Sequence, residues 1–441
     1  MIKVIKLIII TTSLLFGSEG FSQDSQNYTT FSKIDPSIPL LSEVDYLNFI
    51  RISILEQPEY LFSISTVEEK NMSVKFAKRS RFPELSLRVI NDSVLKRDIQ
   101  DINSVRKRQD DSFDAAVELS QPLYSGGAIN ARIGMARNDL TISSLIREQT
   151  VSEQIVEANR IYLQAIKSDL LYNYGLGIVE EARPYLDRVK DRVSSGIADP
   201  MALAVFSIRF NDLYSKVQML KTQKSRDIAM YEYFFKSKYE SVHFPNIFIS
   251  PVKKDIKHVG YDVELAILGH KGKELETTLT RSEFRPQFGF NTRYTKYDIK
   301  DDENESDVRG GIYLSLPLFT FGRAKAKVSS YEAKAAAAKM YINIERKLDD
   351  GKESELINVI ESSLNIREDV YNTFNDTKKQ RKIIGDRLEI INFAPEAFVD
   401  TGFKELNQLE RVLITEINLL DGYMQFLHQN RALNSFIMIR P

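Results

Sequence analysis

Residues able to perform covalent or metal chemistry are few in this chain and lie far apart. The 441 residues contain no cysteine and only four histidines, at positions 243, 258, 270 and 428. None of the histidines stands in the H-E-x-x-H context of a zinc site. Without cysteine the chain has no thiolate nucleophile, no disulfide and no thiolate metal site. We therefore predict that the protein is not an enzyme and that it binds no catalytic metal and no cofactor.

Two glycine-containing segments are loosely similar to phosphate-binding loops. Gly269–Lys273 has too few residues between its glycines and no Ser or Thr after the lysine. Ser125–Gly127 lies at a predicted junction of strand and helix, but its counterpart Thr320–Gly322 lacks the second glycine. We interpret these junction segments as turns.

The charge of the chain excludes a further class of function. Lys and Arg number 60 against 61 Asp and Glu, a formal net charge of −1, so the protein has no overall field with which to bind nucleic acid. We expect no nucleic-acid partner. A secreted hydrolase, the enzyme alternative, would need a nucleophile or paired acids in a recognisable motif, and the chain offers neither.

The N-terminus has the layout of a secretory signal peptide. Lys3 and Lys6 precede an apolar stretch at 7–16, and small and polar residues follow up to Ser22. This stretch is too short to span a bilayer, which needs about 20 residues. We predict a signal peptide at 1–22. Because there is no cysteine, we also predict that the mature protein is not lipidated.

A large internal duplication organises the rest of the chain. Segment 116–127 (AVELSQPLYSGG) resembles segment 311–322 (GIYLSLPLFTFG) at an offset of 195 residues. A period near 200 residues is far longer than the 20 to 50 residues of solenoid repeats. The predicted strand-to-helix turns of the two copies are marked by Pro122, Gly127, Pro317 and Gly322. We predict a first repeat at 23–235, a connector at 236–262 and a second repeat at 263–441.

Each repeat contains two short segments in which apolar and polar residues alternate, as in half-buried strands. We predict two-strand hairpins at 84–122 and 286–318, with charged, solvated loops. The apolar strand face comprises Leu85, Leu87, Val117, Leu119, Phe288, Phe290, Ile312, Leu314 and Leu316. The polar face comprises Arg88, Glu118, Ser120, Asn291, Arg293 and Ser315.

The remaining parts of the repeats are predicted to be unusually long helices. Residues 138–195 contain no strand signal, and a helix of that length would extend about 87 Å. Gly196 is predicted to end it. The second repeat is predicted to contain a helix at 324–401 that ends at Gly402. After that turn, apolar residues continue at heptad spacing from Leu406 to Leu427, so we expect antiparallel pairs of long helices with tips near 196–199 and 402–405.

Four amphipathic strands cannot close a barrel, and open sheet edges are costly in lipid. Copies of the chain must therefore complete the sheet, and three copies give 12 strands. We predict a mainly α fold with a membrane β part: a trimeric 12-stranded transmembrane β-barrel, with long antiparallel helices forming a helical barrel to one side. The apolar strand face would meet lipid, and the polar face would line the lumen.

These features resemble the outer-membrane efflux proteins of the TolC type. The resemblance rests on the two strand-turn-helix segments that end at Gly127 and Gly322, on Gln57–Glu59 in the first helix, and on two Val-x-x-Gly turns at Gly196 and Gly402. It covers nearly the whole mature chain.

The resemblance implies a homotrimer in the outer membrane of a Gram-negative bacterium, in contact with outer-membrane lipid and with a periplasmic extension. It implies a periplasmic membrane-fusion adaptor and an inner-membrane pump of the RND, ABC or MFS type as partners. The protein would be the passive exit duct of a tripartite efflux or type I secretion system. The connector would form an equatorial belt around the helical tube.

The resemblance also implies functional positions. The periplasmic tip, where the adaptor would dock, corresponds to Gly196, Asp199, Gly402 and Lys404. The residues expected to line the entrance are Glu405, Gln408, Glu410 and Arg411. Family members often carry acidic residues there, but Gln408 and Arg411 occupy the corresponding positions, so cation selectivity cannot be transferred. Glu405 and Glu410 are candidate gate acids, with solvated tip charges as the alternative.

An alternative of another class is a soluble periplasmic coiled-coil scaffold or adaptor protein, in which the strands would form a small sheet domain. This alternative predicts a protein that needs no detergent. Among channels, efflux of small molecules and secretion of proteins cannot be separated from the sequence, because the pump selects the cargo.

Overall fold

The chain folds into two similar halves of strands and very long helices. A computed structural model describes residues 28–29, 40–93, 95, 111–240, 243–249, 259–297, 299, 305–390 and 395–437. The predicted signal peptide lies outside these residues. The first half follows the order α1–α2–β3–β4–α3–α4, and the second follows α5–β7–β8–α6–α7–α8. This order confirms the predicted duplication.

The helices and strands have the following bounds. The helices are α1 (Glu43–Leu55), α2 (Pro58–Arg79), α3 (Ala128–Ser194), α4 (Pro200–Phe235), α5 (Tyr261–Ser282), α6 (Arg323–Ile390), α7 (Pro395–Gln429) and α8 (Leu433–Phe436). The main sheet contains β3 (Glu84–Ser93), β4 (Asp111–Tyr124), β7 (Gln287–Lys296) and β8 (Ser306–Ser315). Gln57 precedes α2, so Gln57–Glu59 open α2 and do not belong to the first helix.

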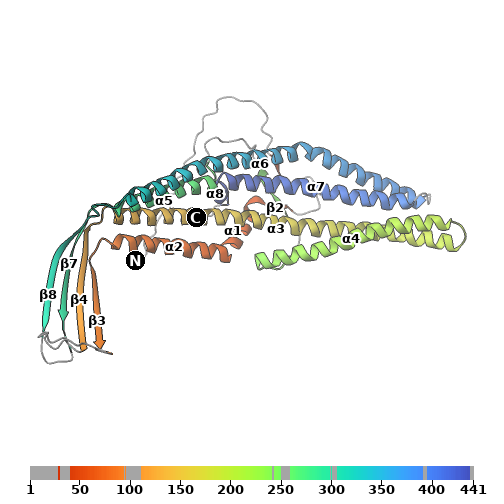
Figure 1. Ribbon diagram of the computed structural model, residues 1–441. Helices are drawn as coiled ribbons and strands as arrows, with labels where there is room; N and C mark the ends of the chain where they lie inside the picture. Colours follow the sequence, from red (N-terminus) through yellow and green to blue (C-terminus); the bar gives the residue numbers. More distant parts are fainter. Residues whose placement is uncertain are drawn as a thin grey trace, which may run out of the picture.

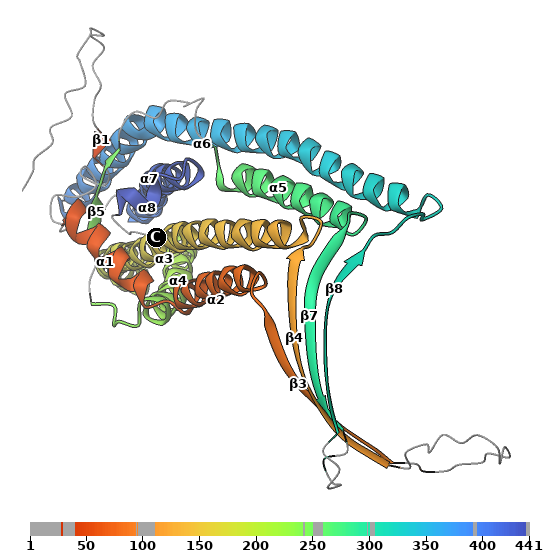
Figure 2. The ribbon, with the colours of Figure 1, turned by 90° about the vertical axis from the view of Figure 1, so that its left-hand side faces the viewer.

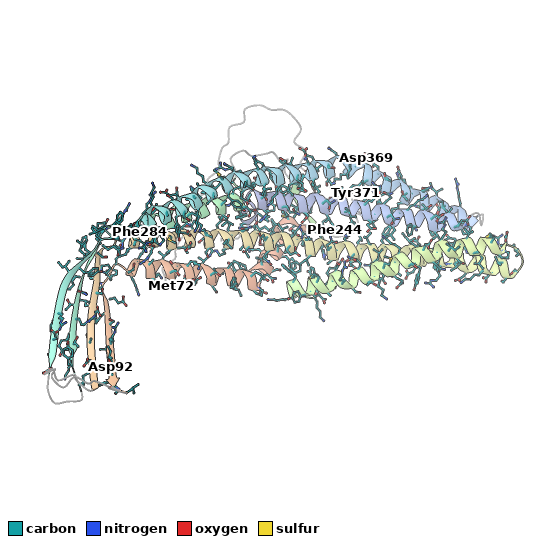
Figure 3. The ribbon with its side chains drawn as sticks, in the orientation of Figure 1. Met72, Asp92, Phe244, Phe284, Asp369 and Tyr371 are labelled. Atoms are coloured by element: carbon teal, nitrogen blue, oxygen red, sulfur yellow. The ribbon has the colours of Figure 1, made fainter. Side chains whose placement is uncertain are left out.

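The four-stranded sheet projects from one end of the helices (Figure 1). Its strands are antiparallel in the order β3-β4-β7-β8. Phe284 lies where α5 leads into the sheet, and Asp92 lies near the opposite end of the strands (Figure 3). The sheet and the helices are therefore distinct parts of one elongated protomer.

Strand register separates the apolar and polar residues onto two faces. Leu85 pairs with Leu119, which pairs in turn with Thr292 of β7. Two residues along β7, Phe290 pairs with Ile312. Because directly paired residues point to the same side of a sheet, eight of the nine residues predicted to be apolar-facing share one face. The ninth, Leu316, lies after the end of β8.

The opposite face carries the predicted polar residues. Glu118 pairs in register with Arg293, and Arg293 Nη2 lies 3.1 Å from Glu118 Oε2. Ser120 pairs with Asn291 on the same side. Arg88 and Ser315 fall on this face by the same alternation.

Near the sheet, α2, α3, α5 and α6 lie side by side in one curved layer (Figure 2). In this layer α2 packs against α3, α3 against α5, and α5 against α6. Farther from the sheet the protein consists of two helical hairpins, α3 with α4 and α6 with α7. At about 1.5 Å per residue, the 67-residue α3 extends about 100 Å.

The predicted heptad seam of α7 forms part of the core. The buried seam residues are Leu406, Leu409, Leu413, Ile417, Leu420 and Met424. They belong to one apolar cluster with Phe206 and Leu213 of α4 and Ile166 of α3. Burial of each such side chain contributes about 1.5–3 kcal/mol, so this seam holds the two hairpins together.

Both strand-to-helix turns have the same construction. Gly127 and Gly322 have φ of 99° and 83°, in the left-handed region that favours glycine. Ser125 Oγ accepts a hydrogen bond from Ile129 N at 3.2 Å, and Thr320 Oγ1 accepts one from Ala324 N at 3.3 Å. The turns therefore repeat in structure as they do in sequence. Pro122 lies at a register shift in β4, and Pro317 follows β8.

The predicted tip at Gly402 is wrong. Gly402 lies inside α7 and is buried, and Lys404 is an exposed residue of the same helix. In the second hairpin α6 ends at Ile390 and α7 begins at Pro395, and residues 391–394 lie outside the described residues. Gly402 serves close packing instead, since a Cβ there would lie 2.5 Å from Ile178 Cγ2 of α3.

The connector pairs with the N-terminal segment. Strand β2 (Leu40–Ser42) pairs in parallel with β5 (Phe244–Asn246), and β1 (Tyr28–Thr29) pairs antiparallel with β6 (Phe248–Ile249). The Tyr162 hydroxyl of α3 donates a hydrogen bond to the His243 carbonyl at 2.8 Å. No helix in the described part of the chain is both long and apolar enough to cross a membrane.

Candidate functional site

A buried ion-pair network links the two helical hairpins at the end remote from the sheet. Arg381 of α6 donates from Nε to Glu405 Oε2 of α7 at 2.5 Å. A second guanidinium nitrogen of Arg381 contacts Glu181 of α3. The Tyr174 hydroxyl of α3 donates to Glu405 Oε1. This cluster, which we call the hairpin network, therefore joins α3 to both α6 and α7.

The hairpin network holds charge away from water. Glu405 is 0% exposed, and the Arg381 side chain is 14% exposed. An unpaired charge in such a position would be strongly unfavourable, so each group depends on its partner. Burial lowers the pKa of Arg381, but the hydrogen bonds and charges of Glu405 and Glu181 outweigh it and leave that pKa above its ordinary value. Burial, together with Glu405, also raises the pKa of Tyr174.

A second buried pair stabilises the α6–α7 hairpin closer to its middle. Arg367 Nε lies 2.5 Å from Glu416 Oε1, and the Tyr371 hydroxyl donates to the same oxygen at 3.0 Å. Tyr371 lies on α6 (Figure 3). Glu416 is completely buried. This pair stays within one hairpin, whereas the hairpin network crosses between hairpins.

The predicted tip of the first hairpin is a turn in the structure. Gly196 follows α3 with φ of 72°, and nothing lies within 4 Å of the position its Cβ would take. Asp199 is the N-cap of α4, and its carboxylate accepts a hydrogen bond from Met201 N at 2.8 Å. Both residues therefore lie at the end of the molecule remote from the sheet.

The predicted entrance residues are divided between buried and exposed positions. Glu405 does not line an opening in the protomer, because its side chain faces α3 and α6 in the hairpin network. Glu410 is partly exposed and forms an ion pair with Lys216 of α4 at 2.9 Å. Gln408 and Arg411 are neighbours on the surface of α7, and Arg411 Nη1 donates a hydrogen bond to Gln408 Oε1 at 3.2 Å.

Several functional candidates were missed at the sequence level. These are Tyr174, Glu181, Arg367, Tyr371 and Arg381, all in the two long helices α3 and α6. The available signal lies in α7, where Glu405 and Glu416 adjoin the apolar seam and are 11 residues, or about three helical turns, apart. Charges beside a buried seam indicate buried partners.

A groove of about 840 Å³ opens beside the hairpin network, between α3 and α6. Five basic side chains line it: Arg188, Lys378, Lys379, Arg381 and Lys382. In other parts of the described chain, His270 Nδ1 lies 3.0 Å from the Ala335 carbonyl and His428 Nδ1 lies 2.8 Å from Ser152 Oγ. Within the described ranges, no group of three His, Asp or Glu side chains is arranged to hold a metal ion.

Comparison with known proteins gives matches at the level of structure. No protein-family model matches the sequence, and no curated protein matches it. The outer membrane channel CmeC of Campylobacter jejuni superposes with a TM-score of 0.75 at 11% identity, over 96% of this chain and 94% of CmeC. The outer-membrane channel OprN gives 0.75 at 12%, over 95% and 99%. The MtrE channel of Neisseria gonorrhoeae, in its open state, gives 0.71 at 11%, over 94% and 98%.

The chain has the fold of the TolC-type outer-membrane efflux channels. This confirms the predicted fold class, in which long antiparallel helices carry four antiparallel strands in two similar halves. Arg381 lies nine residues before the end of α6, and Glu405 lies ten residues after the start of α7, so the hairpin network lies toward the end of the helices remote from the sheet. At identities of 11 to 12%, the likeness concerns the course of the backbone.

Proposed function

We propose that this protein is the outer-membrane exit duct of a tripartite efflux or type I secretion system. The observation that carries the proposal is a TolC-type fold over nearly the whole chain, together with a sheet whose apolar residues share one exposed face. The signal peptide at 1–22 and the absence of a lipid anchor are part of this proposal.

The sheet has the properties of a barrel segment. Leu85, Leu87, Ile312 and Leu314 are exposed on one face of the protomer, and a large exposed apolar surface marks a contact with a partner or with lipid. In lipid, each unpaired backbone group at a sheet edge costs several kcal/mol, so the outer strands must be paired by further copies. A homotrimer would supply 12 strands, with the Glu118–Arg293 face toward an aqueous lumen.

The helical end is the proposed contact with the rest of the export system. A periplasmic membrane-fusion adaptor would dock around the turn formed by Gly196 and Asp199, and an inner-membrane pump of the RND, ABC or MFS type would supply cargo and energy. The channel itself would act passively. Gln408, Glu410 and Arg411 remain candidates for the entrance lining.

The hairpin network is the proposed gate latch. It ties α7 to α3 through Glu405 and Tyr174, and α6 to α3 through Arg381 and Glu181. An outward swing of the α6–α7 hairpin away from α3 would have to break these contacts and expose or re-pair their charges. Glu405 would thus act as a gate acid through its buried ion pair, and not as a solvated ring charge.

Membrane fractionation combined with channel recording tests the proposed function. We expect the mature chain in the outer-membrane fraction, as a detergent-extracted homotrimer that conducts ions across a planar lipid bilayer. A monomer in the soluble periplasmic fraction would contradict the proposal and favour the coiled-coil scaffold.

A further inference from the structure

Both flanks of the protomer combine an open sheet edge with an exposed helix. Within the described residues, β3 and β8 are the outer strands of the main sheet, and each is paired on one side only. On the β3 flank, α2 packs against α3. On the β8 flank, α6 packs against α5 in the part near the sheet (Figures 1 and 2). The two flanks are different surfaces, and no further strand among the described residues pairs with the outer side of β3 or β8.

The first flank contains an apolar groove between α2 and α3. The groove has a volume of about 580 Å³, and Phe62 of α2 and Ile142 and Ile146 of α3 line it. Phe62 is 74% exposed. Ser143 Oγ and Arg147 Nε line the same groove and are buried without a hydrogen-bond partner in the described part of the chain. An apolar groove of this size with unsatisfied polar atoms indicates a surface that a partner covers.

The second flank contains a ridge on α6. Its exposed apolar residues are Met340, Tyr341, Ile344 and Leu348, whose spacing brings them close together on the helix surface. Met340 lies 17 residues after the first residue of α6, and Phe62 lies 17 residues before the last residue of α2. At about 1.5 Å per residue, both are about 26 Å from their junction with the sheet. The ridge and the groove therefore lie at the same distance from the sheet.

The two flanks also match in heptad register. Phe62 and Glu69 are seven residues apart on α2, and Lys334 and Tyr341 are seven residues apart on α6. The two helices run in opposite directions relative to the sheet. When Phe62 is placed opposite Tyr341, Glu69 therefore falls opposite Lys334. The negative charge of Glu69 then faces the positive charge of Lys334. One heptad nearer the sheet, Phe76 falls opposite Lys327, whose aliphatic stem can cover the ring.

We propose that the α6 ridge of one copy of this chain fills the α2–α3 groove of the next copy, with Tyr341 against Phe62 and Lys334 against Glu69. The proposal rests on the proposed function, which requires identical neighbours. Because ridge and groove are different surfaces, the contact is head-to-tail and forms a closed ring when the rotation between copies closes. The same contact brings the β8 edge of one copy beside the β3 edge of the next.

Paired cysteines test this contact without background, because the chain contains no cysteine. We expect oxidation of F62C/Y341C in outer membranes to give bands at two and three times the chain mass on non-reducing gels, and the bands should collapse on reduction. E69C/K334C should behave in the same way and leaves the apolar surfaces intact. The matched control is F62C/I383C. Ile383 is 51% exposed against 52% for Tyr341, but it lies about 63 Å farther along α6, so no cross-link is expected.

The outcomes separate this contact from the proposed function. Suppose that the protein is trimeric by native mass and that all thiols react with a maleimide, but that neither double variant forms a cross-link. That result would overturn the contact and leave the channel proposal intact. A monomeric protein in the membrane would overturn both. A disulfide-linked dimer of the single variant F62C would indicate a two-fold contact between identical surfaces, which overturns the head-to-tail arrangement.

Discussion

Glu405 shows how single residues can tie distant parts of this protein together. Its carboxylate is completely buried, and it is tolerated because Arg381 and Tyr174 satisfy both of its oxygens. Among the described residues, the other acidic partner of Arg381 is Glu181, whose side chain is 57% exposed. Loss of the Glu405 charge would therefore leave the buried guanidinium poorly compensated.

We expect Glu405→Gln to destabilise the folded protein by roughly 1–3 kcal/mol, because a buried charged donor loses its partner while side-chain size is kept. Thermal unfolding of the purified protein measures the change. Glu410→Gln is the matched control on the same helix, since its pair with Lys216 is partly exposed and such pairs contribute about 0–1 kcal/mol. Equal losses in the two variants would show that burial of Glu405 has no energetic role.

Residue types alone could not separate the two glycines predicted to end helices. Gly196 and Gly402 both follow Val-x-x, yet Gly196 occupies an open turn and Gly402 lies against Ile178 inside a helix. The difference depends on whether another helix approaches the glycine, and that information is absent from the local sequence. The wrong prediction at Gly402 therefore has a tertiary cause.

Among elements, strands and hairpins were predictable because their signals are local. Alternation along β3, β4, β7 and β8 places eight of nine apolar residues on one face. The start of α7 also had a local signal, since Pro395 stands at its first position, where proline is favoured.

The two strand faces should respond differently to the same added charge. We expect Leu314→Arg to reduce assembly in the outer membrane, because an arginine facing lipid near mid-bilayer costs about 2–4 kcal/mol in each subunit. Ser315→Arg, on the next residue and the opposite face, should assemble at the level of the unmodified protein. The measurement is the amount of trimer in outer-membrane fractions. Equal assembly of both variants would show that the lipid and lumen faces are wrongly assigned.

For the whole molecule, the sequence predicted the architecture and missed the contacts that lock it. Tyr174 and Glu405 are 231 residues apart, and Arg381 and Glu181 are 200 apart. These residue pairs form only when the two helical hairpins, which come from different halves of the chain, pack against each other in one particular register. A shift of a single turn along α3 or α6 would give these residues other partners, and neither periodicity nor composition determines that shift.

The proposed register between α2 of one copy and α6 of the next can be tested by charge reversal. Reversal of one charge by Glu69→Lys would place two lysines opposite each other at every interface of the ring. A like-charge contact of this kind costs about as much as an ion pair gains, up to about 1 kcal/mol. We therefore expect the trimer to dissociate at a temperature lower by about 1–2 °C. Adding Lys334→Glu to the same chain should restore the original temperature, because the pair is then re-formed with its signs exchanged.

Glu68→Lys, which projects about 100° around α2 from Glu69, is the control and should not respond to Lys334→Glu. A double variant no more stable than Glu69→Lys alone would mean that α2 and α6 of neighbouring copies do not meet in this register.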